Sequence, residues 1–155
     1  MFSTPQSFYY SGFCAGEMSC SVLKMSNKGQ GYYYTPDVTV ANSDKFLLQQ
    51  LNVVVAQGKG HITSIKGGYN LSMRGKERVN IVLSFFEQYP FLTGDIVNSK
   101  MDILRKAVSC LSEKKQSNVR SSVQEDFIEE CRAQLQEIKK TGLPLQTFAP
   151  IKADT

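Results

Sequence analysis

The strongest constraint on the fold comes from two pairs of strand-like segments, each joined by a short turn that contains glycine. The first pair spans residues 19–25 and 32–41, on either side of a turn at 26–31. The second pair spans 61–65 and 69–74, on either side of Gly67 and Gly68. Turns of this composition join antiparallel strands, so the sequence predicts two β-hairpins.

Helical signals surround the two hairpins. A capping residue, Ser3 or Thr4, precedes Pro5 at the start of a helix that is predicted to reach Glu17. A second helix is expected between Ser43, as its N-cap, and the glycines at 58 and 60, and further helices at 76–88, 96–114 and 123–140. Hairpins that alternate with helices predict an α+β fold with the helices on one face of the sheet. We expect one domain over residues 1–143 and an irregular tail over 144–155.

Bulk properties exclude several classes of protein. The net charge of +4, from 18 basic and 14 acidic residues, is a mild bias toward polyanions. A structural zinc site is not expected, because no two cysteines form a C-x-x-C pair and the chain has one histidine. Neither a signal peptide nor an apolar run of the roughly 20 residues that span a bilayer is present. We therefore expect a soluble protein with reduced thiols and no membrane partner.

A strip of small residues runs along the first predicted helix. Gly12 and Gly16 are four residues apart, as are Ser11 and Ala15. A glycine inside a helix costs about 1 kcal/mol relative to alanine, and such a strip allows close packing within one subunit or between two. Glu17 ends this helix, where the dipole disfavours a carboxylate, so a cation or hydrogen-bond donor is expected beside it. If two strips pack together, two Glu17 side chains meet near the dyad and repel unless metal ions lie between them.

Residues 10–18, YSGFCAGEM, resemble the motif of the LAGLIDADG homing endonucleases, with Glu17 at the position of the metal-binding acid. Further segments are similar to the family's second strand and helix, its third strand, its "YPLLT" segment and the end of its C-terminal helix. These segments lie at 38–51, 58–62, 89–93 and 138–143. Together they follow the family's order over residues 8–143, which a lone motif match would not do.

The resemblance implies an αββαββα fold, with an antiparallel, saddle-shaped sheet and helices on one face. Single-motif chains of the family typically act as homodimers that bind a long DNA site and cleave both strands with divalent metal, here expected to be magnesium. The resemblance further implies a mitochondrial or chloroplast location, where the family is common. For this chain it assigns the metal and catalysis to Glu17 and the dimer contact to Ser11, Gly12, Ala15 and Gly16.

Departures from the family's pattern leave a second function open. Gly94 and Asp95 stand where the family tends to carry a basic residue, so the next candidate for the catalytic cation is Lys100. Val40 stands where the family usually has a glutamine near the scissile phosphate. These departures favour the alternative of a catalytically degenerate relative that binds structured RNA, as an intron maturase or a component of an organellar ribosome.

Alternation along the predicted strands defines the face that would meet nucleic acid. Hydroxyl, amide and arginine side chains can read base edges, and lysines that flank the hairpins, with Arg78, can contact phosphates. The same pattern also fits an ordinary solvated face. Leu23, Met25 and Asp37 share this face, and the two apolar side chains favour the RNA-binding alternative. The candidate nucleic-acid-binding residues are Ser19, Ser21, Lys28, Tyr33, Thr35, Thr39, His61, Thr63, Lys66, Asn70, Ser72 and Arg74.

Overall fold

The computed structural model describes residues 4–26, 28–29, 31–90, 95–112 and 122–141. Within these ranges the predicted order of helices and hairpins is confirmed, and each described boundary lies within two residues of its predicted position. The predicted tail, 144–155, lies outside the described residues. No described helix is long and apolar enough to cross a membrane. The elements are α1 (Thr4–Glu17), β1 (Met18–Ser26), β2 (Tyr32–Asn42), α2 (Lys45–Ala56), β3 (His61–Ile65), β4 (Gly68–Arg74), α3 (Lys76–Gln88), α4 (Asp95–Ser112) and α5 (Ser122–Thr141).

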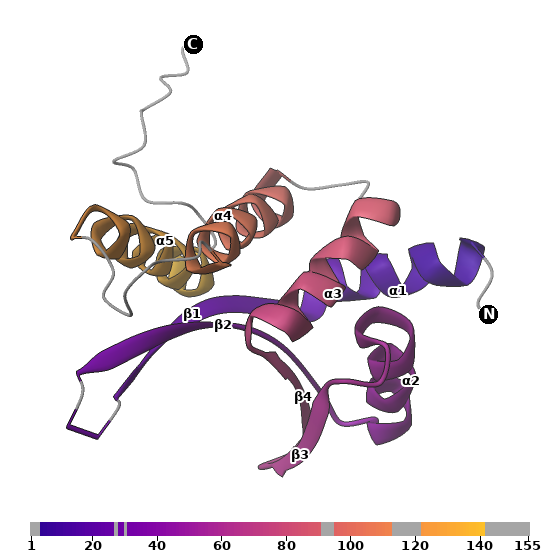
Figure 1. Cartoon of the computed structure of the whole chain (residues 1–155). Coiled ribbons are helices and arrows are strands. Elements are labelled where there is room, and N and C mark those ends of the chain that lie inside the picture. Colours follow the sequence, from indigo (N-terminus) through magenta and orange to yellow (C-terminus); the bar gives the residue numbers. More distant parts are fainter. Residues whose placement is uncertain (1–3, 27, 30, 91–94, 113–121, 142–155) are drawn as a thin grey trace.

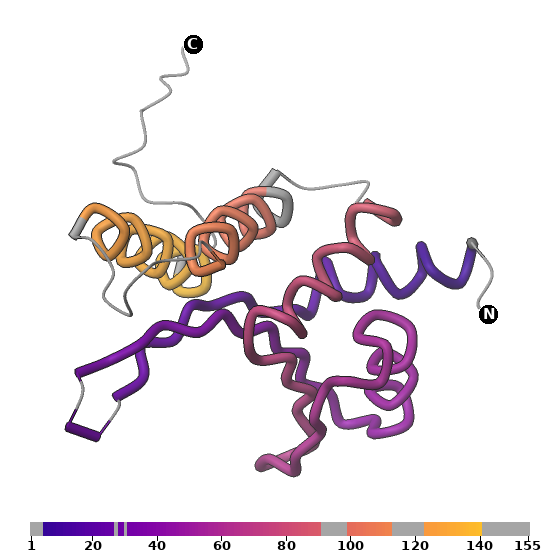
Figure 2. Tube along the Cα trace, in the orientation of Figure 1, coloured from indigo at the N-terminus to yellow at the C-terminus, as the bar shows by residue number. Residues whose placement is uncertain are grey.

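The four strands form one antiparallel sheet in the order β1-β2-β4-β3. The sheet is strongly curved, and the described helices all lie on one side of it (Figure 1). The trace in Figure 2 shows the β1–β2 hairpin running beneath α4 and α5, while α2 lies beside β3 and β4. The predicted α+β architecture with helices on one face is therefore confirmed, and one face of the sheet stays uncovered by the described helices.

The core lies between the sheet and the helices. Val38 and Val40 of β2 are at most 1% exposed and pair with Met73 and Leu71 of β4, which are equally buried. Burial of such side chains stabilises the fold by about 1.5–3 kcal/mol each. The largest fully buried side chains that the helices contribute are Leu48, Leu51, Phe86, Met101, Leu104, Ile128 and Leu135.

The N-terminus of α2 is capped by Asp44, not by the predicted Ser43. The Asp44 side chain accepts a hydrogen bond from the Leu47 backbone N–H at 3.3 Å, and the Asp44 N–H donates to Asn42 Oδ1 at 2.8 Å. Both serine and aspartate are good N-caps, so the choice between these adjacent residues depends on where the preceding strand ends. The helix ends at Ala56, just before the predicted glycines, with Gln57 as its C-cap at a φ of 53° and Gly58 next at a φ of 77°.

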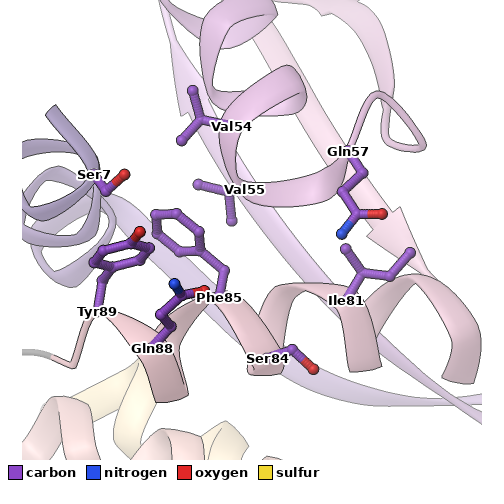
Figure 3. A pocket seen from close by; sticks show the side chains of 9 residues that line it. All are labelled: Ser7, Val54, Val55, Gln57, Ile81, Ser84, Phe85, Gln88 and Tyr89. Carbon is purple, nitrogen blue, oxygen red and sulfur yellow. The ribbon is translucent and has the colours of Figure 1, made fainter. Parts of the chain in front are cut away.

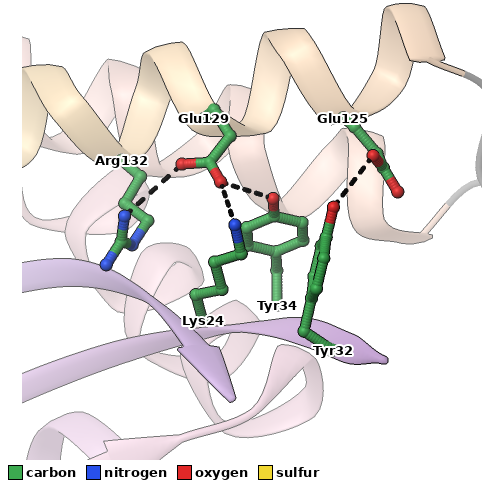
Figure 4. A network of polar contacts seen from close by, with 6 residues as sticks. All are labelled: Lys24, Tyr32, Tyr34, Glu125, Glu129 and Arg132. Carbon is green, nitrogen blue, oxygen red and sulfur yellow. Dashed lines mark hydrogen bonds and ion pairs between the residues drawn. The ribbon is translucent and has the colours of Figure 1, made fainter. Parts of the chain in front are cut away.

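Polar contacts fasten the long β1–β2 hairpin to α5 (Figure 4). The Lys24 Nζ lies 2.9 Å from Glu129 Oε2, and the Tyr34 hydroxyl donates to the same oxygen at 2.7 Å. The Tyr32 hydroxyl donates to Glu125 Oε2 at 3.2 Å. The hydrogen bonds from Tyr34 and then Lys24 hold the pKa of the Glu129 carboxyl below its usual range. The network fixes the direction in which the hairpin leaves the body of the protein.

Candidate metal site and nucleic-acid interface

The strand register gathers most of the candidate nucleic-acid residues on the uncovered face of the sheet. Thr39 pairs with Ser19 on one side and with Ser72 on the other, and Ser72 also pairs with His61. Since side chains alternate along a strand, all residues in phase with these share their face. That face, called the saddle face below, carries Ser19, Ser21, Leu23, Met25, Tyr33, Thr35, Asp37, Thr39, His61, Thr63, Asn70, Ser72 and Arg74. The other two candidates, Lys28 and Lys66, are exposed in the turns of the two hairpins.

Two adjacent hollows mark the β3–β4 half of the saddle face. The first has a volume of about 470 Å³ and is lined by Thr39, His61, Thr63, Asn70, Ser72, Arg74 and Arg78. The second, about 600 Å³, is lined by Gly58, Lys59, Arg74, Gly75, Lys76, Glu77 and Arg78. The first hollow offers hydroxyl, amide and guanidinium groups, and the second is mainly cationic. The pair of hollows therefore combines groups that read base edges with groups that attract phosphates.

Glu17 and Lys100, the two catalytic candidates, both lie near the end of α1. Glu17, the last residue of α1, is exposed, and its carboxylate makes no hydrogen bond or ion pair in the part of the chain that the structure describes. The Nζ of Lys100, from α4, donates a hydrogen bond to the carbonyl oxygen of Met18, the next residue, at 3.1 Å. The two catalytic candidates, 83 positions apart in sequence, are thus placed at one end of one helix.

The small-residue strip divides between the two sides of α1. Gly12 and Gly16 are exposed, and a Cβ atom at either position would meet nothing within 4 Å. Packing inside this subunit therefore gives no reason for either glycine. Ala15 is half-buried. Ser11 differs from the other three residues, because it is 1% exposed and its hydroxyl donates a hydrogen bond to the Tyr89 carbonyl oxygen at 2.7 Å. Ser11 therefore faces the interior of the subunit and does not belong to the exposed strip.

Comparison with known families adds an independent observation. The sequence model of the LAGLIDADG endonucleases matches residues 10–101, which is more than half of the chain. This chain belongs to the LAGLIDADG endonuclease family. A comparison with curated proteins finds no match.

Solved LAGLIDADG structures share the fold. The homing endonuclease I-GzeII in complex with its DNA target has a TM-score of 0.73 and 17% identity over 96% of this chain and 53% of that chain. I-SmaMI bound to cleaved DNA has a TM-score of 0.70 and 18% identity over 96% and 51%. I-CpaMI bound to uncleaved DNA has a TM-score of 0.61 and 20% identity over 85% and 50%. This chain spans about half the length of the structures that it matches.

The departure from the LAGLIDADG pattern at Val40 remains once the strand register is known. Val40 is 1% exposed and faces the helices, so it cannot stand beside a phosphate on the saddle face. Because Met18 pairs with Val40, the saddle-face position at the Glu17 end of β2 belongs to Ala41, which is exposed. A shift of one residue along a strand moves a side chain to the other face. Val40 therefore cannot take the place of the family's glutamine beside a phosphate, and neither can the alanine next to it.

The structure places Lys100, the candidate catalytic cation, near the end of α1. Gly94 lies outside the described residues, and Asp95 begins α4. Lys100 follows five residues later and reaches the carbonyl beside Glu17 from α4. A lysine ammonium therefore lies beside the backbone at the end of α1, and its part in catalysis stays a prediction.

The residues at the end of α1 fit a divalent cation that has other ligands as well. Among the described residues, no three histidine, cysteine, aspartate or glutamate side chains cluster closely enough to hold a metal alone. Magnesium binds through one or two carboxylates and completes its octahedron with phosphate oxygens and water. An exposed carboxylate without a protein partner, as at Glu17, suits that role.

The helix side of the LAGLIDADG fold has a different chemistry. A hollow of about 540 Å³ between α1, α2 and α3 is lined by Ser7, Val54, Val55, Gln57, Ile81, Ser84, Phe85, Gln88 and Tyr89, none of them charged (Figure 3). The buried thiols of Cys14 and Cys20 are unsuited to nucleophilic chemistry, because burial raises the pKa of each to about 12. The groups that could act on a polyanion therefore lie at the end of α1 and on the saddle face.

Proposed function

We propose that this chain is a metal-dependent DNA endonuclease that acts as a homodimer. One observation carries the proposal: at the end of α1, where the chain enters the saddle face, Glu17 is exposed and the Lys100 ammonium reaches the backbone carbonyl of the next residue, Met18. A carboxylate can hold a divalent metal, and an ammonium can stabilise negative charge that builds up on a phosphate. Membership of the LAGLIDADG endonuclease family supports the same conclusion.

A dimer explains the glycines of α1. The exposed backbone at Gly12 and Gly16 lets a second helix approach closely, and in a symmetric dimer that helix is the same segment of the other copy. Half-buried Ala15 borders this strip. The packing would place two Glu17 side chains near the dyad, and their mutual repulsion favours the binding of cations. Two copies would also double the length of the saddle, in keeping with the lengths of the solved relatives.

Each part of the chain has a separate task in phosphodiester hydrolysis. The saddle face would hold the duplex, because each of its hairpins is a two-stranded ribbon that fits the major groove and carries polar groups to the base edges. Lys28 and Lys66, at the two turns, would contact phosphates. Glu17 would hold magnesium, which supplies charge stabilisation and an activated water when it is bound. Lys100 would stabilise the extra charge on the phosphate, an effect of about 3–4 kcal/mol for comparable donors.

Structured RNA is the second candidate ligand of the same face. Leu23 and Met25 are half-buried in the absence of any partner, and Tyr33 is 42% exposed beside them. Aromatic side chains stack on unpaired bases, which favours RNA loops. In that case the protein would bind without cleavage, as a maturase or a component of an organellar ribosome.

The experiment is cleavage of plasmid DNA that carries the intronless host locus, taken from a mitochondrial or chloroplast genome, the proposed location. Wild type is compared in magnesium with Glu17→Gln and with a matched control, Glu130→Gln, on the exposed surface of α5. Cleavage at a discrete site that is lost only in Glu17→Gln supports the proposal. Absence of cleavage by folded wild type in magnesium and manganese, with RNA bound, contradicts it and favours the second candidate.

A further inference from the structure

A buried acid stands on a face that should meet a polyanion. Asp37 lies in β2 on the saddle face, and only 6% of its side chain is exposed. Burial of a carboxylate is costly unless partners compensate it, and an acid on this face also repels phosphates. Asp37 therefore needs a reason other than general attraction of nucleic acid.

The partners of Asp37 are two neighbouring side chains of β4. The Ser72 hydroxyl donates a hydrogen bond to Asp37 Oδ1 at 3.1 Å, and Arg74 Nη2 lies 3.7 Å from Asp37 Oδ2. Asp37 and Arg74 are also directly paired across the two strands. Each oxygen of the carboxylate thus faces one side chain, and both side chains line the hollow of about 470 Å³.

These contacts determine what the hollow presents. The Ser72 hydroxyl has one proton, which it donates to Asp37, so toward a ligand its oxygen can only accept hydrogen bonds. One end of the Arg74 guanidinium lies within ion-pair distance of Asp37, and the Arg74 side chain remains 51% exposed. The unit therefore offers a pre-oriented double donor next to an acceptor.

We propose that Asp37, Arg74 and Ser72 form a unit that selects a G·C pair at one position of each half-site. In the major groove guanine presents two acceptors, O6 and N7, which match the arginine fork, and cytosine presents an N4–H donor, which matches Ser72. Asp37 is the positioning residue, because it orients both partners without touching the base. The inference rests on the proposed function, in which the saddle face binds duplex DNA.

Electrostatics favour a base edge over a phosphate as the ligand of Arg74. A carboxylate a few ångströms away cancels most of the attraction between Arg74 and an anion. The acceptors O6 and N7 on the guanine edge carry only partial negative charge, so the same carboxylate repels them far less than it repels a phosphate. Phosphates are better served by Lys59, Lys76 and Arg78 in the neighbouring hollow.

The test is selection of bound sequences from a pool of randomised duplex DNA, in calcium instead of magnesium to slow cleavage. Wild type is compared with Asp37→Asn, with Arg74→Gln and with the matched control Lys66→Gln, after thermal unfolding has shown that each is folded. Wild type should enrich a guanine at one position in both half-sites. Asp37→Asn and Arg74→Gln should weaken that preference by about ten-fold and leave the other positions intact, because glutamine matches adenine and not guanine. Lys66→Gln should weaken binding to all sequences alike.

Each other outcome overturns a defined part of the account. A guanine preference that survives Arg74→Gln, with uniformly weaker binding, assigns Arg74 to a phosphate. A preference that survives Asp37→Asn, with only a lower unfolding temperature, reduces Asp37 to a role in stability. Failure of folded wild type to enrich any sequence contradicts the proposed DNA-binding function itself.

Discussion

Gly12→Ala should change the stability of the subunit and the stability of the dimer in opposite directions. Gly12 lies inside α1, and the added Cβ would meet nothing within 4 Å in the subunit. The change therefore acts on the isolated fold through helix propensity alone, which favours alanine by about 1 kcal/mol. In the proposed dimer each new methyl group enters the close contact between helices, where overpacking typically costs about 1–3 kcal/mol. No change that acts only inside the subunit would give both effects.

The two effects are measured separately. Denaturant unfolding, at concentrations where sedimentation shows a monomer, should give a free energy of unfolding about 1 kcal/mol higher than wild type. Sedimentation equilibrium should show a dissociation constant about ten-fold larger or more. Gly68→Ala is the control for a crowded glycine, because its Cβ would lie 2.8 Å from the Asn42 carbonyl oxygen, and it should destabilise the fold. A less stable Gly12→Ala monomer, or unchanged self-association, would refute the assignment of this strip to a dimer.

Three further predictions concern catalysis, pH and thiol reactivity. Lys100→Gln should lower the rate of DNA cleavage by about 10²–10³-fold while DNA affinity measured in calcium stays close to wild type; an unchanged rate would remove Lys100 from the site. The pKa of Glu129 is lowered from its usual value near 4.5, so its contribution to stability is present above that pH and is lost as the pH falls through the lowered pKa. Glu129→Gln should therefore show a slightly smaller loss of stability below pH 4.5 than wild type in acid unfolding, and equal losses would contradict the network. Cys14 and Cys20 should react with a thiol reagent at pH 8 only after unfolding, because both are buried and their pKa is raised to about 12; rapid reaction of the native protein would contradict their burial.

The sheet could be predicted from the sequence because its signals are local. Alternation of apolar and polar residues has a period of two, so Val38 and Val40 identify the buried face and Thr39 the opposite one. Glycine turns fixed where each hairpin reverses. The same period explains why Val40 faces the helices and not the saddle face, since a shift of one residue along a strand moves a side chain to the other face.

Contacts between distant segments could not be predicted in this way. The meeting of Lys100 with the carbonyl of Met18 depends on how α4 packs across the sheet, which no local pattern records. The inward direction of Ser11 depends on its hydrogen bond to Tyr89, at the end of α3. The proposed role of Asp37 in base selection likewise depends on two residues of another strand. The sequence alone shows only an acidic residue on a face that otherwise suits nucleic acid.

The central claim, that two copies of this chain each supply one Glu17 to cut one duplex, is tested most directly by a mixed dimer. A wild-type copy and a Glu17→Gln copy, carrying different affinity tags, are co-expressed, purified through both tags and incubated with target plasmid and magnesium. We predict that the mixed dimer binds the target but makes no double-strand break, leaving nicked or intact DNA. Double-strand cleavage by the mixed dimer at the wild-type rate would contradict the account, because one copy would then suffice for both strands.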